Sequence, residues 1–191
     1  MKKGKKAEMG IGTLIIFIAM ILVAAVAAGV LIQTSTSLQS KALLTGERSK
    51  GQVATAVQTV SIAAEDGSTN NNVENFEHVV KIAPGSDAVR LSDAVITFET
   101  DSESQTYTYN STATCGTQQT GQYAASALLG EDNGYLEKGD VVMLCYDSPS
   151  SVGEDETVRI SLTPKVGNRM VIETSLPEVI TETRTQIYPS N

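Results

Sequence analysis

The chain has 191 residues, enough for one domain of ordinary size and one additional segment. Its formal net charge is −8, and the first ten residues, with Lys2, Lys3, Lys5 and Lys6 against Glu8, carry +3, so the remainder carries −11. Such an acidic body argues against nucleic acid or an anionic membrane face as its partner, because both would repel it at neutral pH.

Residues 11–32 form an uninterrupted apolar segment. They include no charged residue, and Thr13 is the only one with a hydrogen-bonding side chain. As a helix with a rise of about 1.5 Å per residue, they span roughly 33 Å, close to the hydrocarbon thickness of a bilayer. The preceding lysines, and the absence of charge until Lys41, predict a membrane span with a cytoplasmic N-terminus and the rest of the chain outside.

Three kinds of N-terminal segment fit this composition. A secretory signal would be cut after the small residues 25–27, and the mature chain would begin near Ala28. A simple anchor would keep everything from Met1. A cut after Gly10, on the cytoplasmic side, would keep the whole apolar helix as the new N-terminus.

The helical pattern continues beyond the length that a membrane requires. Apolar or small residues recur three or four apart from Leu31 to Ala63, and the first proline is Pro84. The spacing predicts one helix from about Gly12 to Ala64, roughly 80 Å long at 1.5 Å per residue. A signal peptide has no use for this extension, which therefore favours a retained helix.

The apolar part of this predicted helix must be covered by lipid or by other helices. Small residues lie four apart at Ala24 and Ala28 and at Ala25 and Gly29, which lets helix backbones approach closely. A plain single-pass anchor rich in alanine remains the alternative. If helices pack here, the predicted contact positions are Leu14, Ile18, Leu22, Ala24, Ala25, Ala28, Gly29, Leu31 and Leu38.

The run "GIGTLIIFIAMILVAAVAAGVLI", followed by "LQSKALLTGERS", closely resembles archaellins, the filament subunits of the archaeal flagellum, which are related to type IV pilins. The stretches "YLEKGDVVMLCY" and "ISLTPKVGNRMVIETSLP" are similar more loosely. The resemblance implies a class III leader that a prepilin-type peptidase removes after Gly10, so that Ile11 is the first mature residue. Bacterial pilins usually carry Glu at the fifth mature position, where this chain has Ile15.

By this resemblance the chain is a membrane precursor that becomes a homo-oligomeric helical filament outside the cell, with or without other archaellin subunits. An assembly platform and a membrane motor that drives swimming are the further implied partners. The alternatives are an archaeal type IV adhesion pilin and a secreted or tethered β-sandwich module that never polymerises. The predicted organisation is a leader at 1–10, a helix at 11–64, a linker at 65–75 and an outer domain at 76–191.

The polar, turn-forming run 65–72 ends the helical pattern. Beyond it come short stretches rich in β-branched and aromatic residues. About seven strands in roughly 120 residues predict an immunoglobulin-like antiparallel β-sandwich, so the fold class is α+β. The predicted strands are 77–82, 94–100, 105–110, 141–146, 157–163, 169–174 and 178–188.

Cys115 and Cys145 are the only cysteines. Outside the cell they can form a disulfide, which would close a loop of about 30 residues and stabilise by roughly 3 to 4 kcal/mol. The alternative is a buried free thiol at Cys145 and an unrelated loop thiol at Cys115. Asn110 begins the only Asn-X-Ser/Thr triplet, at a predicted strand end where a glycan can project into solvent.

No pattern of residues indicates catalysis, a cofactor or a metal. The acidic clusters 131–134 and 154–156 lack the spacing of an EF-hand loop and are interpreted as solvated turns. His78, the sole histidine, is predicted to be a surface residue of a strand. No second histidine or nucleophile motif accompanies it, so we expect a structural protein and not an enzyme.

Overall fold

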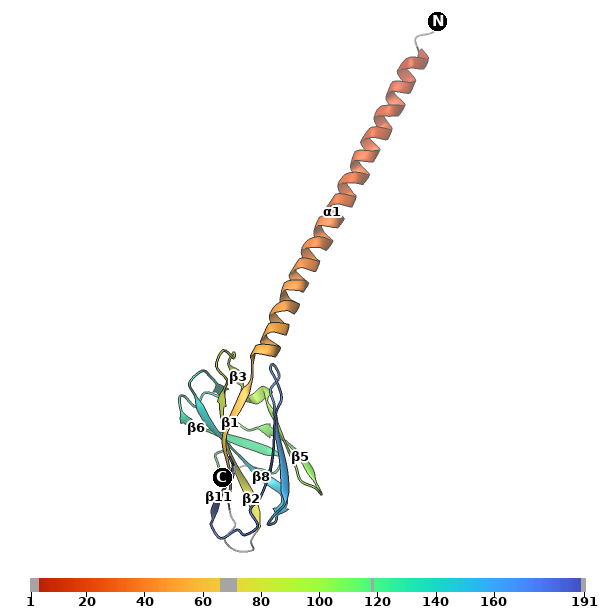
Figure 1. Cartoon of the computed structure of the whole chain (residues 1–191). Helices are drawn as coiled ribbons and strands as arrows, with labels where there is room; N and C mark the ends of the chain where they lie inside the picture. Colours follow the sequence, from red (N-terminus) through yellow and green to blue (C-terminus); the bar gives the residue numbers. More distant parts are fainter. Residues whose placement is uncertain (1–3, 66–71, 118, 190–191) are drawn as a thin grey trace. The chain divides into compact units, whose positions relative to one another are not determined.

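The computed structural model describes residues 4–65, 72–117 and 119–189. In this part of the chain a single long helix, α1 (Gly4–Ala54), precedes a β domain (Figure 1). A short 3-10 helix spans Leu91–Asp93. The strands are β1 (Val57–Glu65), β2 (Val73–Ile82), β3 (Val89–Arg90), β4 (Val95–Glu99), β5 (Ser104–Tyr109), β6 (Gln122–Leu129), β7 (Tyr135–Leu136), β8 (Val141–Val152), β9 (Thr157–Thr163), β10 (Met170–Ser175) and β11 (Arg184–Tyr188).

The chain divides into two compact units, whose boundary lies between Glu47 and Arg48. The first unit contains the apolar part of α1. The second contains the last turns of α1 and all the described strands. The predicted α+β class, a long apolar helix followed by a mostly antiparallel β domain, is confirmed.

Among the described residues, nine strands form one continuous sheet in the order β10-β9-β4-β5-β6-β8-β2-β1-β11, and β3 pairs with β7. All neighbours are antiparallel except β5 and β6, which pair in parallel only at Thr108 with Gln122 and Tyr109 with Tyr123. The sheet folds over at this short pairing. Its two ends meet where Thr174 Oγ1 donates a 2.8 Å hydrogen bond to the carbonyl oxygen of Ile187.

The core lies between the two layers that this folding creates. The rings of Phe76 on β2 and Phe98 on β4 have centroids 4.7 Å apart, and those of Tyr107 on β5 and Tyr146 on β8 are 5.4 Å apart. Tilted aromatic pairs of this kind add about 0.5 to 1.5 kcal/mol beyond the burial of their surface. Strand alternation brings these rings inward; on β4 each buried residue is flanked by half-buried ones.

The predicted helix end at Ala64 is wrong. Helix α1 ends at Ala54, and residues 57–65 form β1. Val57, Ile62 and Ala64 of this strand lie in the core, and Ile62 sits opposite both Tyr188 and His78. The residues of β1 also recur at helical spacing, so the pattern fits both structures, and pairing with the distant β2 and β11 decides between them.

The predicted linker 65–75 is also misplaced at both ends, because Glu65 belongs to β1 and Val73 begins β2. Residues 66–71 lie outside the described residues. The outer domain therefore begins with β1 and not at residue 76.

The predicted strand 157–163 coincides with β9, and five others overlap β2, β4, β5, β8 and β10. The last predicted strand, 178–188, retains only Arg184–Tyr188, since Ile180 instead packs into the core outside the sheet. The predicted immunoglobulin-like sandwich has about seven strands, which is too few, because the described residues form eleven strands. The sequence does not predict strand β6, because its alanine-rich residues, QYAASALL, have low β-propensity.

Candidate functional site

Large apolar side chains cover all sides of α1 between Met9 and Ile32. Phe17 is 62% exposed, Leu22 62% and Leu31 69%, and every other large apolar residue of this stretch is also exposed. Burying such surface gains about 25 cal/mol per Å², so lipid or protein must cover it in the cell. By length and composition, α1 is able to cross a membrane.

The predicted packing positions occupy two adjacent stripes of α1, and all of them are exposed. Successive members of each stripe follow the helical period, which places them on one face. One stripe contains Leu14, Ile18, Leu22, Ala25 and Gly29, and the other contains Ala24, Ala28, Leu31 and Leu38. A Cβ added to Gly29 would meet nothing within 4 Å, so this surface is open to the backbone of another helix.

The Gly10–Ile11 bond lies inside continuous helix. The carbonyl oxygen of Gly10 accepts a 3.0 Å hydrogen bond from Thr13 Oγ1. A Cβ added to Gly10 meets nothing within 4 Å, although glycine inside a helix costs about 1 kcal/mol relative to alanine. The chain's own packing therefore does not require glycine at this position.

In the polar part of α1, several hydroxyl groups form hydrogen bonds with the helix's own backbone. Thr34, Thr36, Ser40 and Thr45 each donate to a carbonyl oxygen three or four residues earlier, at 2.8 to 3.1 Å. A hydroxyl group satisfied in this way can be buried among helices at little cost. This part of α1 is thus suited to water and to protein surroundings.

The end of α1 is fixed to the β domain by residues that no local sequence pattern indicates. Ser86 Oγ donates a 3.0 Å hydrogen bond to the Ala54 carbonyl oxygen and accepts another from the Ala56 amide. The Asn168 amide donates to the carbonyl oxygen of the buried Thr55 at 2.9 Å. Gly167, at φ +124°, leaves no room for a side chain, because a Cβ there would lie 2.6 Å from that same oxygen.

Cys115 and Cys145 form a disulfide bond, with Cα atoms 5.3 Å apart. Cys145 is buried on β8, where it pairs with Ala124 of β6 and Glu77 of β2. The bond therefore ties the loop after β5 to the middle of one layer.

Replacing both cysteines with alanine is expected to lower the free energy of unfolding by about 3 kcal/mol, because the bond restricts a loop of about 30 residues in the unfolded chain. Chemical denaturation of the full chain in detergent, followed by tyrosine fluorescence, measures the difference. The reductant dithiothreitol should destabilise the wild type and leave the double variant unchanged. Equal stability of the two proteins under oxidising conditions would contradict the expectation.

Asn110 follows the last residue of β5 and is half-buried. Its Oδ1 accepts hydrogen bonds from the amide and the hydroxyl group of Thr112, at 2.9 and 2.8 Å, and its Nδ2 donates to Gln122 Oε1 at 2.7 Å. The triplet thus forms an Asx turn at a strand end. Glycosylation at Asn110 stays a prediction; Nδ2 carries two hydrogens, so one can still donate to Gln122 when a sugar replaces the other.

The prediction that His78 lies on the surface is wrong, since the side chain is completely buried. It shares the inward face of β2 with Phe76 and Val80. The Nε2 atom of His78 lies 2.7 Å from Thr59 Oγ1, and that hydroxyl group also lies 2.9 Å from the Met170 sulfur. The Nδ1 atom of His78 has no hydrogen-bond partner among the described residues. Burial lowers the pKa of His78 to about 3.

Acid is therefore expected to destabilise the β domain through His78. In the unfolded chain its pKa returns to about 6.5, so below that pH the unfolded state binds a proton that the native state does not. Stability is full above about pH 6.5 and falls toward pH 3, by about 1.4 kcal/mol per pH unit. Between pH 6.5 and 4.5 the wild type should lose about 2 kcal/mol more than His78→Leu in denaturant titrations. Parallel pH profiles of the two proteins would refute this assignment.

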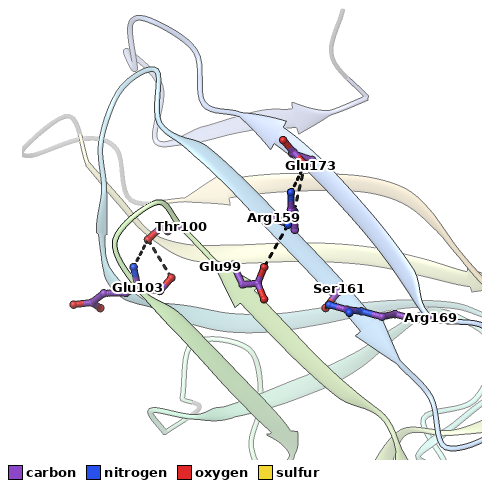
Figure 2. Close-up of polar contacts among 7 residues, drawn as sticks. All are labelled: Glu99, Thr100, Glu103, Arg159, Ser161, Arg169 and Glu173. Atoms are coloured by element: carbon purple, nitrogen blue, oxygen red, sulfur yellow. Dashed lines mark hydrogen bonds and ion pairs between the residues drawn. The ribbon is translucent and has the colours of Figure 1, made fainter.

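The charged residues of the outer face of one layer form ion pairs across strands. Arg159 on β9 lies 2.9 Å from Glu173 of β10 and 3.9 Å from Glu99 of β4, which are its register partners (Figure 2). Thr100 and Glu103 close the β4–β5 turn beside them through the 3.1 Å bond from the Glu103 amide to Thr100 Oγ1. All of these contacts are accounted for by strand pairing and turn formation.

The two acidic clusters serve the loops that contain them. Asn133 Oδ1 accepts the Tyr135 amide at 2.9 Å, and Glu156 Oε2 accepts the Gly153 amide at 3.0 Å. Glu154 Oε1 accepts the Ile180 amide at 3.1 Å. Across the described ranges, no three His, Cys, Asp or Glu side chains come together in a group able to hold a metal ion.

Comparison with known proteins assigns this architecture to a family. The family model described as archaeal-type flagellin matches residues 7–174. Flagellin B1 of Methanocaldococcus jannaschii is 32% identical over 95% of this chain and 94% of its own length, and flagellin A2 of Halobacterium salinarum is 33% identical over 91% and 90%. The chain belongs to the archaeal-type flagellin family, whose members are structural filament subunits.

A solved structure shares the whole fold. The archaeal flagellum of Methanospirillum hungatei strain JF1 matches with a TM-score of 0.73 at 15% identity, over 93% of this chain and 98% of that one. A long helix followed by a β domain is therefore the fold of both chains.

Proposed function

We propose that this chain polymerises through α1 into the extracellular filament of an archaeal flagellum. The main support for this proposal is that residues 11–32 are uncharged and exposed on every side of a helix. The same chain continues from this helix into the β domain. Such a surface is stable in lipid, and in water only when copies cover one another. The role is structural, and no catalysis is proposed.

The precursor sits in the membrane with a cytoplasmic N-terminus, and a prepilin-type peptidase cuts between Gly10 and Ile11. Packing within the chain does not require glycine at position 10, and this supports a role for Gly10 in recognition by the peptidase. Removal of residues 1–10 takes away four lysines and one glutamate, so the new N-terminus begins within the apolar segment. The helix can then leave the bilayer without carrying that charged cluster into the fibre.

In the fibre, neighbouring helices replace the lipid tails. Because lipid is as apolar as the helices, close packing at Ala24, Ala25, Ala28 and Gly29 supplies the preference for protein contacts. Contacts between different faces of identical subunits do not close on themselves, so they produce a helix of indefinite length.

The β domains form the outer coat, and the acidic charge of the chain keeps fibres soluble and apart. The disulfide and the Asn110 triplet suit an extracellular location. A membrane motor rotates the filament for swimming. An adhesion pilin would use the same assembly without this motor, and absence of swimming in cells with normal filaments would favour it.

N-terminal sequencing of the mature protein from isolated filaments tests the processing step. We expect the sequence to begin at Ile11. A chain that begins at Ala28 would indicate ordinary secretion, and one that begins at Met1 would indicate a permanent anchor; either result would overturn the proposal.

A further inference from the structure

Charge is divided unequally between α1 and the β domain. After residue 10, α1 carries Lys41, Arg48 and Lys50 against Glu47 only, a net charge of +2. Residues 55–191 contain seven of the 14 basic residues and 20 of the 22 acidic ones, a net charge of −13. Copies of the same chain therefore present opposite charges to one another along these two parts.

The cations of α1 are concentrated on one face. Lys41, Leu44 and Arg48 follow one another at spacings of three and four, so they line up on the helix surface. We call these three residues the basic face. All are exposed, Leu44 to 54%, and neither cation forms an ion pair with a described residue. Leu43, Glu47 and Lys50 lie on a different side, where the charges balance.

A patch of complementary composition lies on the β domain. Leu128 and Leu129 end β6 and are 55% and 62% exposed, and the exposed Glu131 and Asp132 follow Gly130. We call these four residues the rim patch. The basic face and the rim patch thus each combine exposed leucine with charges of one sign, which is positive on the basic face and negative on the rim patch.

Strand register fixes where the rim patch lies. Leu129 pairs with Val141 of β8, Val141 with Lys81 of β2, and Lys81 with Gln58 at the start of β1. Gln58 is four residues past the end of α1 at Ala54. The rim patch is therefore at the end of the β domain where β1 begins, a few residues after the end of α1.

We propose that the basic face of one subunit docks on the rim patch of another copy of this chain in the filament. The inference rests on the proposed function, because it requires helices to polymerise. It extends the helix contacts outward, from apolar packing at 11–32 to a contact between helix and β domain. Leucines would be shielded from water at its centre, and the surrounding charges would select the register of the subunits.

Anionic lipid is the less suitable occupant of the basic face. Lys41 lies nine residues beyond the apolar segment and Arg48 sixteen, about 13 and 24 Å along the helix. These distances place the cations beyond the headgroup layer of a bilayer and at one Debye length or more from the hydrocarbon. The acidic rim of another copy matches the charge without this separation.

Cysteine cross-linking in isolated filaments tests the contact. Both native cysteines are bonded to each other, so the double variant Leu44→Cys, Leu129→Cys offers one new thiol on each surface. Mild oxidation should yield a ladder of covalently linked subunits on a non-reducing gel. The matched control Leu43→Cys, Leu129→Cys moves the helix thiol about 100° around α1 and should lose most of the ladder.

Charge exchange provides a second measurement. Lys41→Glu with Arg48→Glu should reduce the number of filaments per cell, Glu131→Lys with Asp132→Lys should do the same, and all four changes together should restore it. Lys50→Glu, on the side of α1 where the charges balance, should leave the number of filaments unchanged.

In the cross-linking experiment, equal ladders from the two cysteine pairs would overturn the docking contact. No ladder from either pair, the result that lipid binding predicts, would also overturn it. If the cysteine variants still form fibres in that case, the proposed polymerisation through α1 remains supported. Fibres that lack α1 would instead refute the proposed function itself.

Discussion

Replacing Ala25 with aspartate is expected to abolish filaments. Ala25 lies on the stripe shared by Leu22 and Gly29, in the uncharged segment that the proposed fibre buries. A carboxylate near the centre of a membrane-spanning helix costs about 2.5 to 3.5 kcal/mol, and an unpaired one in a packed core is also penalised. Because every subunit repeats the change, even a modest penalty per contact should prevent elongation.

Electron microscopy of the cell surface and a swimming assay measure this outcome. Gln39→Glu is the matched control, since it introduces the same charge on the polar part of α1, where Gln39 is exposed. Control cells should retain filaments. Abundant filaments in the Ala25→Asp strain would show that this segment is not buried in the fibre.

Replacing Gly10 with valine is expected to leave uncut precursor in the membrane and to eliminate filaments. An added side chain meets no neighbour within the chain, so loss of processing would result from the peptidase and not from misfolding. Mass spectrometry of the membrane fraction should detect a protein that keeps its ten leader residues, while the wild type should lack them.

Gly46→Val is the matched control for Gly10→Val. Gly46 is also a helical glycine whose added Cβ would meet nothing within 4 Å, so both variants impose a similar local change on α1. Normal processing is expected of Gly46→Val. Normal processing and normal fibres in Gly10→Val would show that the peptidase does not require Gly10 at its cleavage site.

The sequence predicts the features that depend on local composition. The membrane-length part of α1 is recognisable because 22 consecutive residues, 11–32, lack charge. Strand β9 is predicted to the residue because polar and apolar residue types alternate from Arg159 to Leu162.

Features that depend on distant contacts are not predictable in this way. The residues of β1 satisfy a helical spacing, and only pairing with β2 and β11 makes them a strand. His78 also alternates with its neighbours, but local alternation does not reveal that Thr59 and Met170 lie near it.

The junction at the end of α1 shows the same limit. Ser86 and Asn168 reach it from segments 30 and more than 100 residues away, so no local pattern marks them. Gly167 carries a weak signal, since a glycine between strand-like segments is typical of a turn. Its close approach to the Thr55 carbonyl oxygen appears only in three dimensions.

A density map of native filaments at side-chain resolution tests the central claim most directly. The account predicts that residues 11–32 of many copies fill the fibre axis, with Ala25 and Gly29 at helix contacts and the β domains outside. An axis filled by β domains, or subunits that lack this helix, would contradict it.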